Sequence, residues 1–320
     1  KRSLRLGLVG ESEILKKVAN ESQYVNGMQV SGIYTEDEKS VRDFLSDIHM
    51  YETYDKLLEN SDAVYIISSP QRHYHDIRYA LEQGKHVLCE SPITLSEAQC
   101  KELFIIAREN HCVLMDAIKT AYATAYHRML LLVKTGIIGN PRSIDATCTS
   151  IRSVDMSDPK AMERSWNSIS AWGPTALLPV LQIFGTDYND ERIITWMDNE
   201  EYHYDAFTKI DFCYPGAVAS VKVGQGVKSE GELVISGTKG YIYVPAPWWK
   251  TEYFEVRFEN PENNRRYFYQ LDGEGIRYEL VSFVRSIESG KCMTNVDESI
   301  SCEVSKTMEK FMNNEIIKIY

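Results

Sequence analysis

Short apolar runs alternate with amphipathic stretches over the first third of the chain. Continuously apolar runs predict strands that are buried on both faces, and an apolar stripe repeating every three to four residues predicts a helix. The predicted strands are residues 4–9, 28–34, 63–67, 86–89 and 113–117, and the predicted helices are residues 14–21, 39–46, 73–83 and 95–109. Such strand–helix alternation predicts a doubly wound parallel sheet of the Rossmann type over residues 1–118.

Strands dominate the rest of the chain. A helix over residues 123–134 precedes strand candidates at 143–151, 193–197, 207–213, 217–223, 232–236, 241–244, 253–258 and 267–270. Turns such as Gly237-Thr238-Lys239-Gly240 separate neighbouring runs, which is typical of hairpins. Two helices, 277–289 and 298–313, follow. Residues 119–320 are therefore predicted to form an α+β domain with a large, mostly antiparallel sheet, and the fold class is α/β overall.

Charge and composition exclude several kinds of partner. The formal net charge of −11 is spread along the chain without a Lys/Arg block, so we expect no nucleic-acid partner. The longest uncharged stretch, residues 165–186, contains Gly173, Pro174 and Pro179, which favours a buried wall over a membrane span. The seven cysteines are odd in number and form no Cys-x-x-Cys motif. They predict reduced thiols in the cytoplasm, and no spacing indicates a metal site.

The turn after the first strand is a partial dinucleotide-binding motif. Gly10 occupies the first of the three glycine positions, but Ser12 and Leu15 occupy the second and third. Glu11 and Glu13 place negative charge where a pyrophosphate would lie. The alternative interpretation is a simple tight turn.

Several motifs occur in the order typical of one known family. They are Ser69-Pro70, the run Gly84-Lys85-His86-Val87-Leu88-Cys89-Glu90-Ser91-Pro92, Gly136-Ile137-Ile138-Gly139, Gly237-Thr238-Lys239-Gly240 and the closing segment 274–291. Over almost its whole length the chain resembles the glucose–fructose oxidoreductase/inositol dehydrogenase/MocA (Gfo/Idh/MocA) family. The resemblance implies hydride transfer between NAD or NADP and a hydroxyl carbon of a sugar or sugar derivative. It also implies a homodimer or tetramer formed through the C-terminal sheet.

The resemblance also implies a set of site residues, several of which are replaced here. The cofactor would lie along Gly10, Ser12, Tyr34, Thr35, Ser69, Pro70, His73 and Glu90. Tyr34, followed by Thr35, stands where an acid would bind the adenosine ribose, and Ser91 stands where relatives have the catalytic lysine of Glu-Lys-Pro. Ala171 and Thr175 stand where relatives have an Asp and a His on a helix. A Ser or Thr hydroxyl does not shuttle protons near neutral pH without an activating base.

Lys119 follows the last predicted Rossmann strand, at the edge where open α/β sheets bind ligands. Our hypothesis is that it replaces the missing lysine as proton donor or contacts an anionic substrate; the alternative is a solvated lysine at a strand end. Arg164, Trp166 and Trp172 either contact a ligand or belong to the core. The aromatic run Pro247-Trp248-Trp249-Lys250 favours a dimer interface over sugar binding.

Three functions remain open at this point. The first is an NAD(P)-dependent oxidoreductase with a rebuilt active site. The second is a non-catalytic descendant that binds a nucleotide or sugar as a sensor or partner subunit. The third is a structural protein that keeps only the fold. Because Lys1 lies directly before the first strand, we also expect the chain to be part of a longer protein or a trimmed one.

Overall fold

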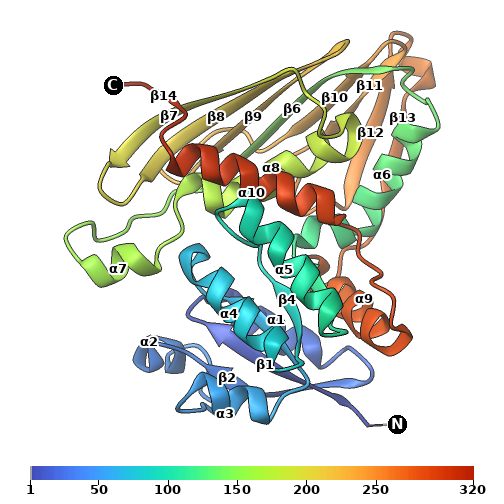
Figure 1. The fold of residues 1–320 in the computed structure, drawn as a ribbon. Helices are drawn as coiled ribbons and strands as arrows, with labels where there is room; N and C mark the ends of the chain where they lie inside the picture. The colour runs from blue at the N-terminus through green and yellow to red at the C-terminus, as the bar shows by residue number, and fades with distance from the viewer. Residues whose placement is uncertain (1) are drawn as a thin grey trace. The chain divides into compact units, whose positions relative to one another are not determined.

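The structure is a computed structural model and describes residues 2–320, so the expectation resting on Lys1 lies outside the described residues (Figure 1). The chain divides into two compact units. The first comprises residues up to Lys119 together with Gly275–Ser305, and the second comprises Thr120–Glu274 together with Lys306–Tyr320. The sequence analysis predicts a domain boundary between residues 118 and 119, close to the one in the structure. It assigns residues 275–305 to the C-terminal domain, whereas in the structure they are part of the first unit.

The first unit is built on a parallel five-stranded sheet with the order β2-β1-β3-β4-β5. Its strands are β1 (Leu4–Gly10), β2 (Met28–Tyr34), β3 (Ala63–Ile67), β4 (His86–Cys89) and β5 (Leu114–Asp116). The strand order reverses between β1 and β3, so a ligand is expected outside the carboxyl ends of these two strands. Gly10 stands at that point with φ +131°, and a Cβ there would lie 2.2 Å from the Ile67 carbonyl oxygen. Only glycine fits this position. The parallel five-stranded sheet confirms the predicted doubly wound fold of the first unit.

The helices of the first unit largely follow the predicted pattern. They are α1 (Ile14–Ser22), α2 (Glu38–Arg42), α3 (Tyr54–Glu59), α4 (Pro70–Glu82), α5 (Glu97–Glu109) and α9 (Ile276–Ser289). The helix α4 begins three residues earlier than the predicted 73–83, because Pro70 occupies its first position, where the missing N–H has no cost. The helix α2 is shorter than the predicted 39–46, and α3 was not predicted.

Side-chain contacts explain why α9 belongs to the first unit. Tyr65 on β3 donates a buried 2.8 Å hydrogen bond to Glu279 on α9. Arg277 Nε donates to Glu21 Oε2 on α1 at 2.9 Å. The sequence pattern predicts this helix but carries no information about the sheet against which it packs, so its assignment to 119–320 differs from the structure.

The second unit is built on a nine-stranded sheet with the order β13-β12-β11-β10-β6-β9-β8-β7-β14. Its strands are β6 (Pro141–Thr149), β7 (Asp190–Asn199), β8 (Tyr204–Tyr214), β9 (Ala217–Gly224), β10 (Leu233–Gly237), β11 (Gly240–Val244), β12 (Tyr253–Phe258), β13 (Arg265–Phe268) and β14 (Ile317–Lys318). Neighbours are antiparallel except for the β6–β9 and β7–β14 pairs. This confirms the predicted large, mostly antiparallel sheet.

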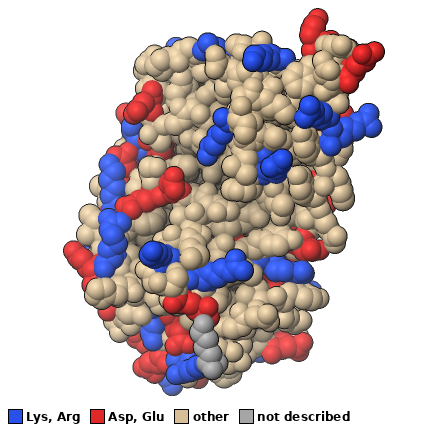
Figure 2. All heavy atoms as spheres, turned by 90° about the vertical axis from the view of Figure 1, so that its right-hand side faces the viewer, with Lys and Arg blue, Asp and Glu red and all other residues tan. Residues whose placement is uncertain are grey.

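The remaining helices are α6 (Thr124–Lys134), α7 (Pro159–Arg164), α8 (Ser168–Phe184) and α10 (Glu298–Met312), and short 3-10 turns lie at Lys119–Tyr122, Pro261–Asn263 and Gly273–Gly275. The helix α8 packs along one face of the nine-stranded sheet and contains the uncharged stretch (Figure 1). Asp205 accepts a hydrogen bond from the Ile169 backbone N–H at 3.1 Å and so caps this helix from β8. Between residues 2 and 320, no helix combines the length and apolarity needed to span a bilayer. Acidic and basic side chains are interspersed on the face shown in Figure 2.

Candidate functional site

The turn between β1 and α1 satisfies its own backbone donors. Ser12 Oγ accepts from the Ile14 N–H at 3.2 Å, and the Ser12 carbonyl accepts from the Leu15 N–H at 3.1 Å. In a Rossmann domain the first N–H groups of this helix are the donors that a pyrophosphate uses. Ser12 therefore occupies part of the site that the second glycine keeps open in the full motif.

A cluster of charged residues surrounds Arg72 on α4, close to this turn. Arg72 Nη1 lies 2.6 Å from Glu11 Oε1 and 3.3 Å from Glu36 Oε2, and Nη2 lies 3.7 Å from Asp76 Oδ2. Burial opposes the charge on the guanidinium, but the carboxylates, Glu11 first, outweigh it and raise the pKa of Arg72. One cation thus faces three carboxylates where the strand order reverses.

The end of β2 carries the acid that the sequence analysis did not find. Tyr34 stacks on Tyr54 with ring centroids 5.7 Å apart, and Thr35 Oγ1 accepts from the Asp37 N–H at 3.1 Å. Glu36, one residue beyond Thr35, reaches Arg72. An acid therefore does follow the second strand, two residues after the expected position.

His73 has a structural position although the resemblance places it near the cofactor. Its side chain is 0% exposed. Nδ1 lies 2.8 Å from the Pro92 carbonyl oxygen and Nε2 lies 2.7 Å from the Ser68 carbonyl oxygen. Burial lowers the pKa of His73 to about 4, although both carbonyl contacts oppose the shift. The ring joins the segment around Ser69 and Pro70 to the segment that follows Ser91.

Ser91 and Asp116 form a buried polar contact at the ends of β4 and β5. Ser91 Oγ donates to Asp116 Oδ2 at 3.2 Å, and Ser301 Oγ on α10 donates to the same oxygen at 2.8 Å. Burial raises the pKa of Asp116 to about 7, against the effect of both hydroxyls. Ser91 therefore contacts an acid whose pKa lies near neutrality.

Lys119 is electrostatically coupled to two further carboxyl groups. Burial raises the pKa of Glu90 to about 7, and the Lys119 ammonium partly offsets this. Burial, followed by the charge of Glu90, raises the pKa of Glu279 well above its ordinary value, and Lys119 again opposes the shift. Glu90, Asp116 and Glu279 are therefore three acids of the first unit whose pKa values burial raises.

In the second unit, the two helix positions predicted from the resemblance, Ala171 and Thr175, share one face of α8. Ala171, Trp172 and Thr175 are half-buried, whereas every other residue from Ser168 to Leu181 is buried. The Trp172 ring lies 4.9 Å from the Trp249 ring, and its Nε1 donates to Ser150 Oγ at 3.1 Å. This face presents an aromatic pair and no acid or histidine.

The other candidates of this unit have different environments. Trp248 is fully buried and donates to the Thr147 carbonyl at 2.9 Å, so it belongs to the core. Arg164 ends α7, and both it and Trp166 are half-buried.

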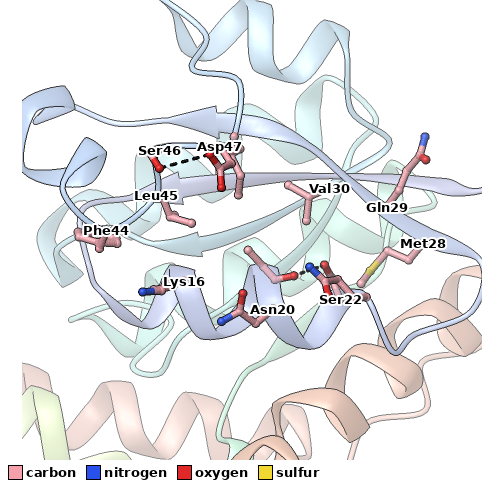
Figure 3. Close-up of a pocket in the computed structure, with 13 residues that line it drawn as sticks. Lys16, Asn20, Ser22, Met28, Gln29, Val30, Phe44, Leu45, Ser46 and Asp47 are labelled. Atoms are coloured by element: carbon pink, nitrogen blue, oxygen red, sulfur yellow. Dashed lines mark hydrogen bonds between the residues drawn. The ribbon is translucent and has the colours of Figure 1, made fainter.

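A separate groove of about 550 Å³ lies beside α1 (Figure 3). Met28 and Val30 of the edge strand β2, together with Phe44 and Leu45, supply its apolar lining, and polar side chains such as Lys16 and Asp47 also line it. No predicted cofactor or catalytic residue lines this groove.

The residues that the sequence analysis missed differ in the signal they carry. Asp116 ends an otherwise apolar buried strand, and Glu279 lies among Ile276, Leu280 and Phe283 on the buried face of α9. An acid at a buried position is a recognisable signal of function. Glu36 and Arg72 lie among other charged residues, so nothing in their pattern distinguishes them.

Comparison with known proteins identifies the chain. Residues 4–117 match the model of the Gfo/Idh/MocA oxidoreductase family, described as having an NAD-binding Rossmann fold. The resemblance to the Gfo/Idh/MocA family thus holds over residues 4–117, the nucleotide-binding part of the chain. The predicted resemblance is thereby confirmed, and the family is one that binds NAD(P).

Relatives within the Gfo/Idh/MocA family act on different compounds. Trans-1,2-dihydrobenzene-1,2-diol dehydrogenase of Oryctolagus cuniculus is 26% identical over 243 residues, which cover 72% of this chain and 71% of the relative. The dTDP-3,4-didehydro-2,6-dideoxy-alpha-D-glucose 3-reductase of Actinomadura kijaniata is 36% identical over 100 residues, which cover 31% of this chain and 30% of the relative.

Solved structures show the same fold. A 3-ketoreductase from Actinomadura kijaniata in complex with NADP and TDP-benzene has a TM-score of 0.86 at 18% identity, covering 100% of this chain and 99% of that one. An oxidoreductase from Agrobacterium radiobacter in complex with NAD+, L-tartaric acid and magnesium has a TM-score of 0.79 at 18% identity, covering 98% and 97%.

Proposed function

We propose that the chain is an NAD(P)-dependent oxidoreductase that acts on a sugar or sugar derivative and uses Lys119 as its proton-carrying group. The observation that carries this proposal is the position of Lys119, which begins the turn directly after β5 at the carboxyl edge of the parallel sheet, where open α/β sheets bind ligands. A general acid or base requires a group whose protonation can change near the working pH. The family's lysine position, Ser91, offers only a hydroxyl that donates to Asp116.

The residues at the strand reversal fit a dinucleotide, with Arg72 as the main adaptation. Gly10 brings the ends of β1 and β3 together, and Arg72, whose side chain is 22% exposed, is a cation within reach of the same turn. Arg72 would bind the pyrophosphate after leaving Glu11, while Thr35 and Glu36 would contact the adenosine ribose. Because the Glu36 carboxylate would repel a 2′-phosphate, we expect NAD to be preferred over NADP.

In the reductive direction the reaction needs one hydride and one proton. A dinucleotide held at the carboxyl edge of the parallel sheet would supply the hydride for the carbonyl carbon of the substrate. The Lys119 ammonium donates the proton to the carbonyl oxygen, and the resulting amine takes a proton from the neighbouring carboxyl groups. In the oxidative direction Lys119 accepts the hydroxyl proton instead.

The aromatic pair Trp172 and Trp249 of the second unit is a separate candidate surface for the apolar face of a sugar ring. Both rings are half-buried, and Trp172 shares its helix face with Ala171 and Thr175, the positions that carry catalytic groups in relatives. A face without charges at these positions favours an uncharged portion of the substrate.

A second candidate function is a non-catalytic protein that binds a nucleotide or sugar. The ion pair of Arg72 with Glu11 favours it, because the cation that would serve the pyrophosphate is engaged by the protein itself. Replacement of the lysine and of both helix residues by Ser91, Ala171 and Thr175 also supports it.

Titration with NADH and NADPH by calorimetry separates the candidates, followed by turnover with oxidised and reduced sugars. Micromolar NADH affinity and turnover that is lost in Lys119→Met support the oxidoreductase. Cofactor affinity without turnover supports the binding protein. No binding up to millimolar NADH and NADPH would overturn the oxidoreductase and the nucleotide-binding form of the second candidate.

The open face of the nine-stranded sheet supports the proposal of a homodimer or tetramer. Trp196, Val218 and Tyr241 are 47%, 52% and 37% exposed. The strand registers place all three on the same face of the sheet. An exposed apolar patch on a sheet face is typical of an interface. Light scattering of Trp196→Lys should show dissociation, and an unchanged mass would exclude this face.

The seven free thiols support a reducing, cytoplasmic location.

A further inference from the structure

Two cysteines from distant parts of the chain contact each other inside the first unit. Cys100 lies on α5, and Cys302 lies near the start of α10. Their Sγ atoms are 3.6 Å apart, with Cys302 as the donor, although 202 positions separate the two residues in the sequence. Cys100 is 0% exposed and Cys302 is 6% exposed, so only Cys302 has a surface that a solute can reach.

Hydroxyl groups on both sides of Cys302 hold this part of α10 in place. Ser301 Oγ donates to Asp116 Oδ2 at 2.8 Å, and Ser305 Oγ accepts from the Thr94 N–H at 3.4 Å. These contacts come from the end of β5 and from the segment before α5, so they position α10 relative to both. The fold therefore keeps the two sulfur atoms together as neighbours.

The two thiols of this pair differ in their chemistry. Contact with the Cys100 thiol lowers the pKa of Cys302, although burial opposes the shift. Contact with Cys302, followed by burial, raises the pKa of Cys100. Once Cys302 has lost its proton, the Cys100 S–H can turn toward the thiolate and stabilise it. Because the thiolate is the form that reacts with oxidants, Cys302 is the first of the two to react.

We propose that Cys302 and Cys100 form a peroxide-sensitive pair, in which hydrogen peroxide oxidises Cys302 and Cys100 then closes an intramolecular disulfide. The reactant is a small hydroperoxide, because only a small molecule reaches the sulfur of a residue that is 6% exposed. The inference is independent of the proposed oxidoreductase, since neither cysteine is assigned to the cofactor or to the substrate.

The reaction balances with one molecule of peroxide. The Cys302 thiolate attacks one oxygen atom, so that a sulfur–oxygen bond forms, the oxygen–oxygen bond breaks and the departing hydroxide takes up the Cys302 proton as water. The Cys100 sulfur then attacks the Cys302 sulfenic acid. A sulfur–sulfur bond forms, the sulfur–oxygen bond breaks and the second hydroxide leaves as water with the Cys100 proton. The two thiols lose two electrons, and the peroxide gains them.

The disulfide would join α5 to α10 and close a loop that contains the whole of Thr120–Glu274. A cross-link between residues so far apart in the sequence restricts the unfolded chain strongly, which stabilises the folded state. We therefore expect the oxidised protein to unfold about 5 °C above the reduced protein.

The first experiment locates the bond by mass spectrometry. The reference variant carries Cys213→Ser and Cys292→Ser, which remove exposed thiols. Dilute reference protein is treated with hydrogen peroxide, alkylated and digested with trypsin, which releases residues 86–101 and 292–306 as separate peptides. We expect a species with the summed mass of these peptides less two hydrogen atoms, and dithiothreitol should separate it. Recovery of the two peptides unlinked would overturn the proposal.

Two variants in the reference background assign the bond within the linked species, because residues 86–101 also contain Cys89. Cys89→Ala is the matched control and should keep the linked species, whereas Cys100→Ala should abolish it. In Cys100→Ala the Cys302 sulfenic acid should accumulate and be trapped by dimedone. Linkage that is lost in Cys89→Ala but kept in Cys100→Ala would overturn the proposal.

The second experiment measures thermal unfolding of the oxidised and reduced reference variant. The midpoint should rise by about 5 °C on oxidation and return after dithiothreitol, and in Cys302→Ser it should not respond to peroxide. An oxidised protein that unfolds at the same or a lower temperature would show that the bond forms only in an opened state. That result would overturn the native contact of Cys100 and Cys302 as the site of oxidation.

Discussion

Tyr65 donates a 2.8 Å hydrogen bond to Glu279 across a separation of 214 positions in the sequence. The bond joins the central strand β3 to α9 inside the first unit. A buried acid on a helix that returns to the sheet from so far along the chain is the least expected part of this Rossmann domain.

Tyr65→Phe should destabilise the protein. Removing the hydroxyl leaves Glu279 Oε1 buried without its donor, which should cost about 1–3 kcal/mol in the free energy of unfolding. Tyr79→Phe is the matched control, because the Tyr79 hydroxyl contacts Asp55 at the surface, where the loss should stay within about 0.5 kcal/mol. Urea unfolding of the two variants measures the difference, and equal midpoints would contradict the importance of the buried contact.

Glu11→Gln should strengthen cofactor binding. The substitution removes the carboxylate that lies 2.6 Å from Arg72, which leaves more of the guanidinium charge for a pyrophosphate. We expect the Kd for NADH to fall about three- to tenfold, or about 0.7–1.4 kcal/mol. Calorimetry should show a smaller change for Glu13→Gln, which removes the same charge from an exposed position on the same turn. An equal effect of both variants would mean that only the overall charge matters.

Stability should decrease as the pH rises from about 4 to about 7. Burial raises the pKa of Asp116 from its ordinary value of 3.8 to about 7 in the folded protein. Between these values the folded state holds a proton that the unfolded state has lost. Each such proton makes the free energy of unfolding fall by about 1.4 kcal/mol per pH unit. The effect is complete above the folded pKa.

The variant Asp116→Asn isolates this contribution. Urea unfolding at pH 5 and pH 8 should show a smaller decrease for Asp116→Asn than for the unsubstituted protein. The exposed Asp43→Asn serves as control and should run parallel to the unsubstituted protein. Parallel curves for all three proteins would show that Asp116 does not titrate in this range.

Trp172→Ala should weaken substrate binding more than it slows the chemical step. Loss of one ring of the aromatic pair removes stacking surface, and we expect KM for the sugar to rise about tenfold with kcat within about twofold, the signature of lost uniform binding. Phe268→Ala, at a 68% exposed position on β13, should change neither constant. A fall in kcat at constant KM would instead place Trp172 in the catalytic step.

Secondary structure follows from the sequence wherever burial is complete. The strands at Ala63–Ile67 and His86–Cys89 have the predicted bounds because they are buried almost throughout, which requires an uninterrupted apolar run. Helix α3 was not predicted, since only Leu57 and Leu58 of its six residues are buried and two residues define no period. The sequence pattern within a helix shows which face is buried but not what that face packs against. It therefore predicts α9 but not its packing against the five-stranded sheet.

The candidate site was predictable only in part, for a related reason. Gly10, Glu90 and Lys119 follow predicted strands, and the carboxyl ends of parallel strands converge on one edge of a sheet. Arg72 on α4 and Glu36 in the loop after β2 contact each other through long side chains, and no local pattern encodes such a contact. The acid expected at position 34 lies two residues further along the chain, at Glu36. The sequence pattern does not fix the position of a loop residue closely enough to reveal such a shift.

The division of the first unit between residues 2–119 and 275–305 has a consequence for synthesis on the ribosome. The five strands emerge early, but α9, which carries the partner of Tyr65, emerges only after the whole of Thr120–Glu274 has been translated. Until then the sheet lacks the helix that covers part of it, and its exposed apolar surface is a target for chaperones. A nascent chain stalled after residue 274 would therefore carry an unfinished nucleotide-binding domain, and its second unit would still lack Lys306–Tyr320.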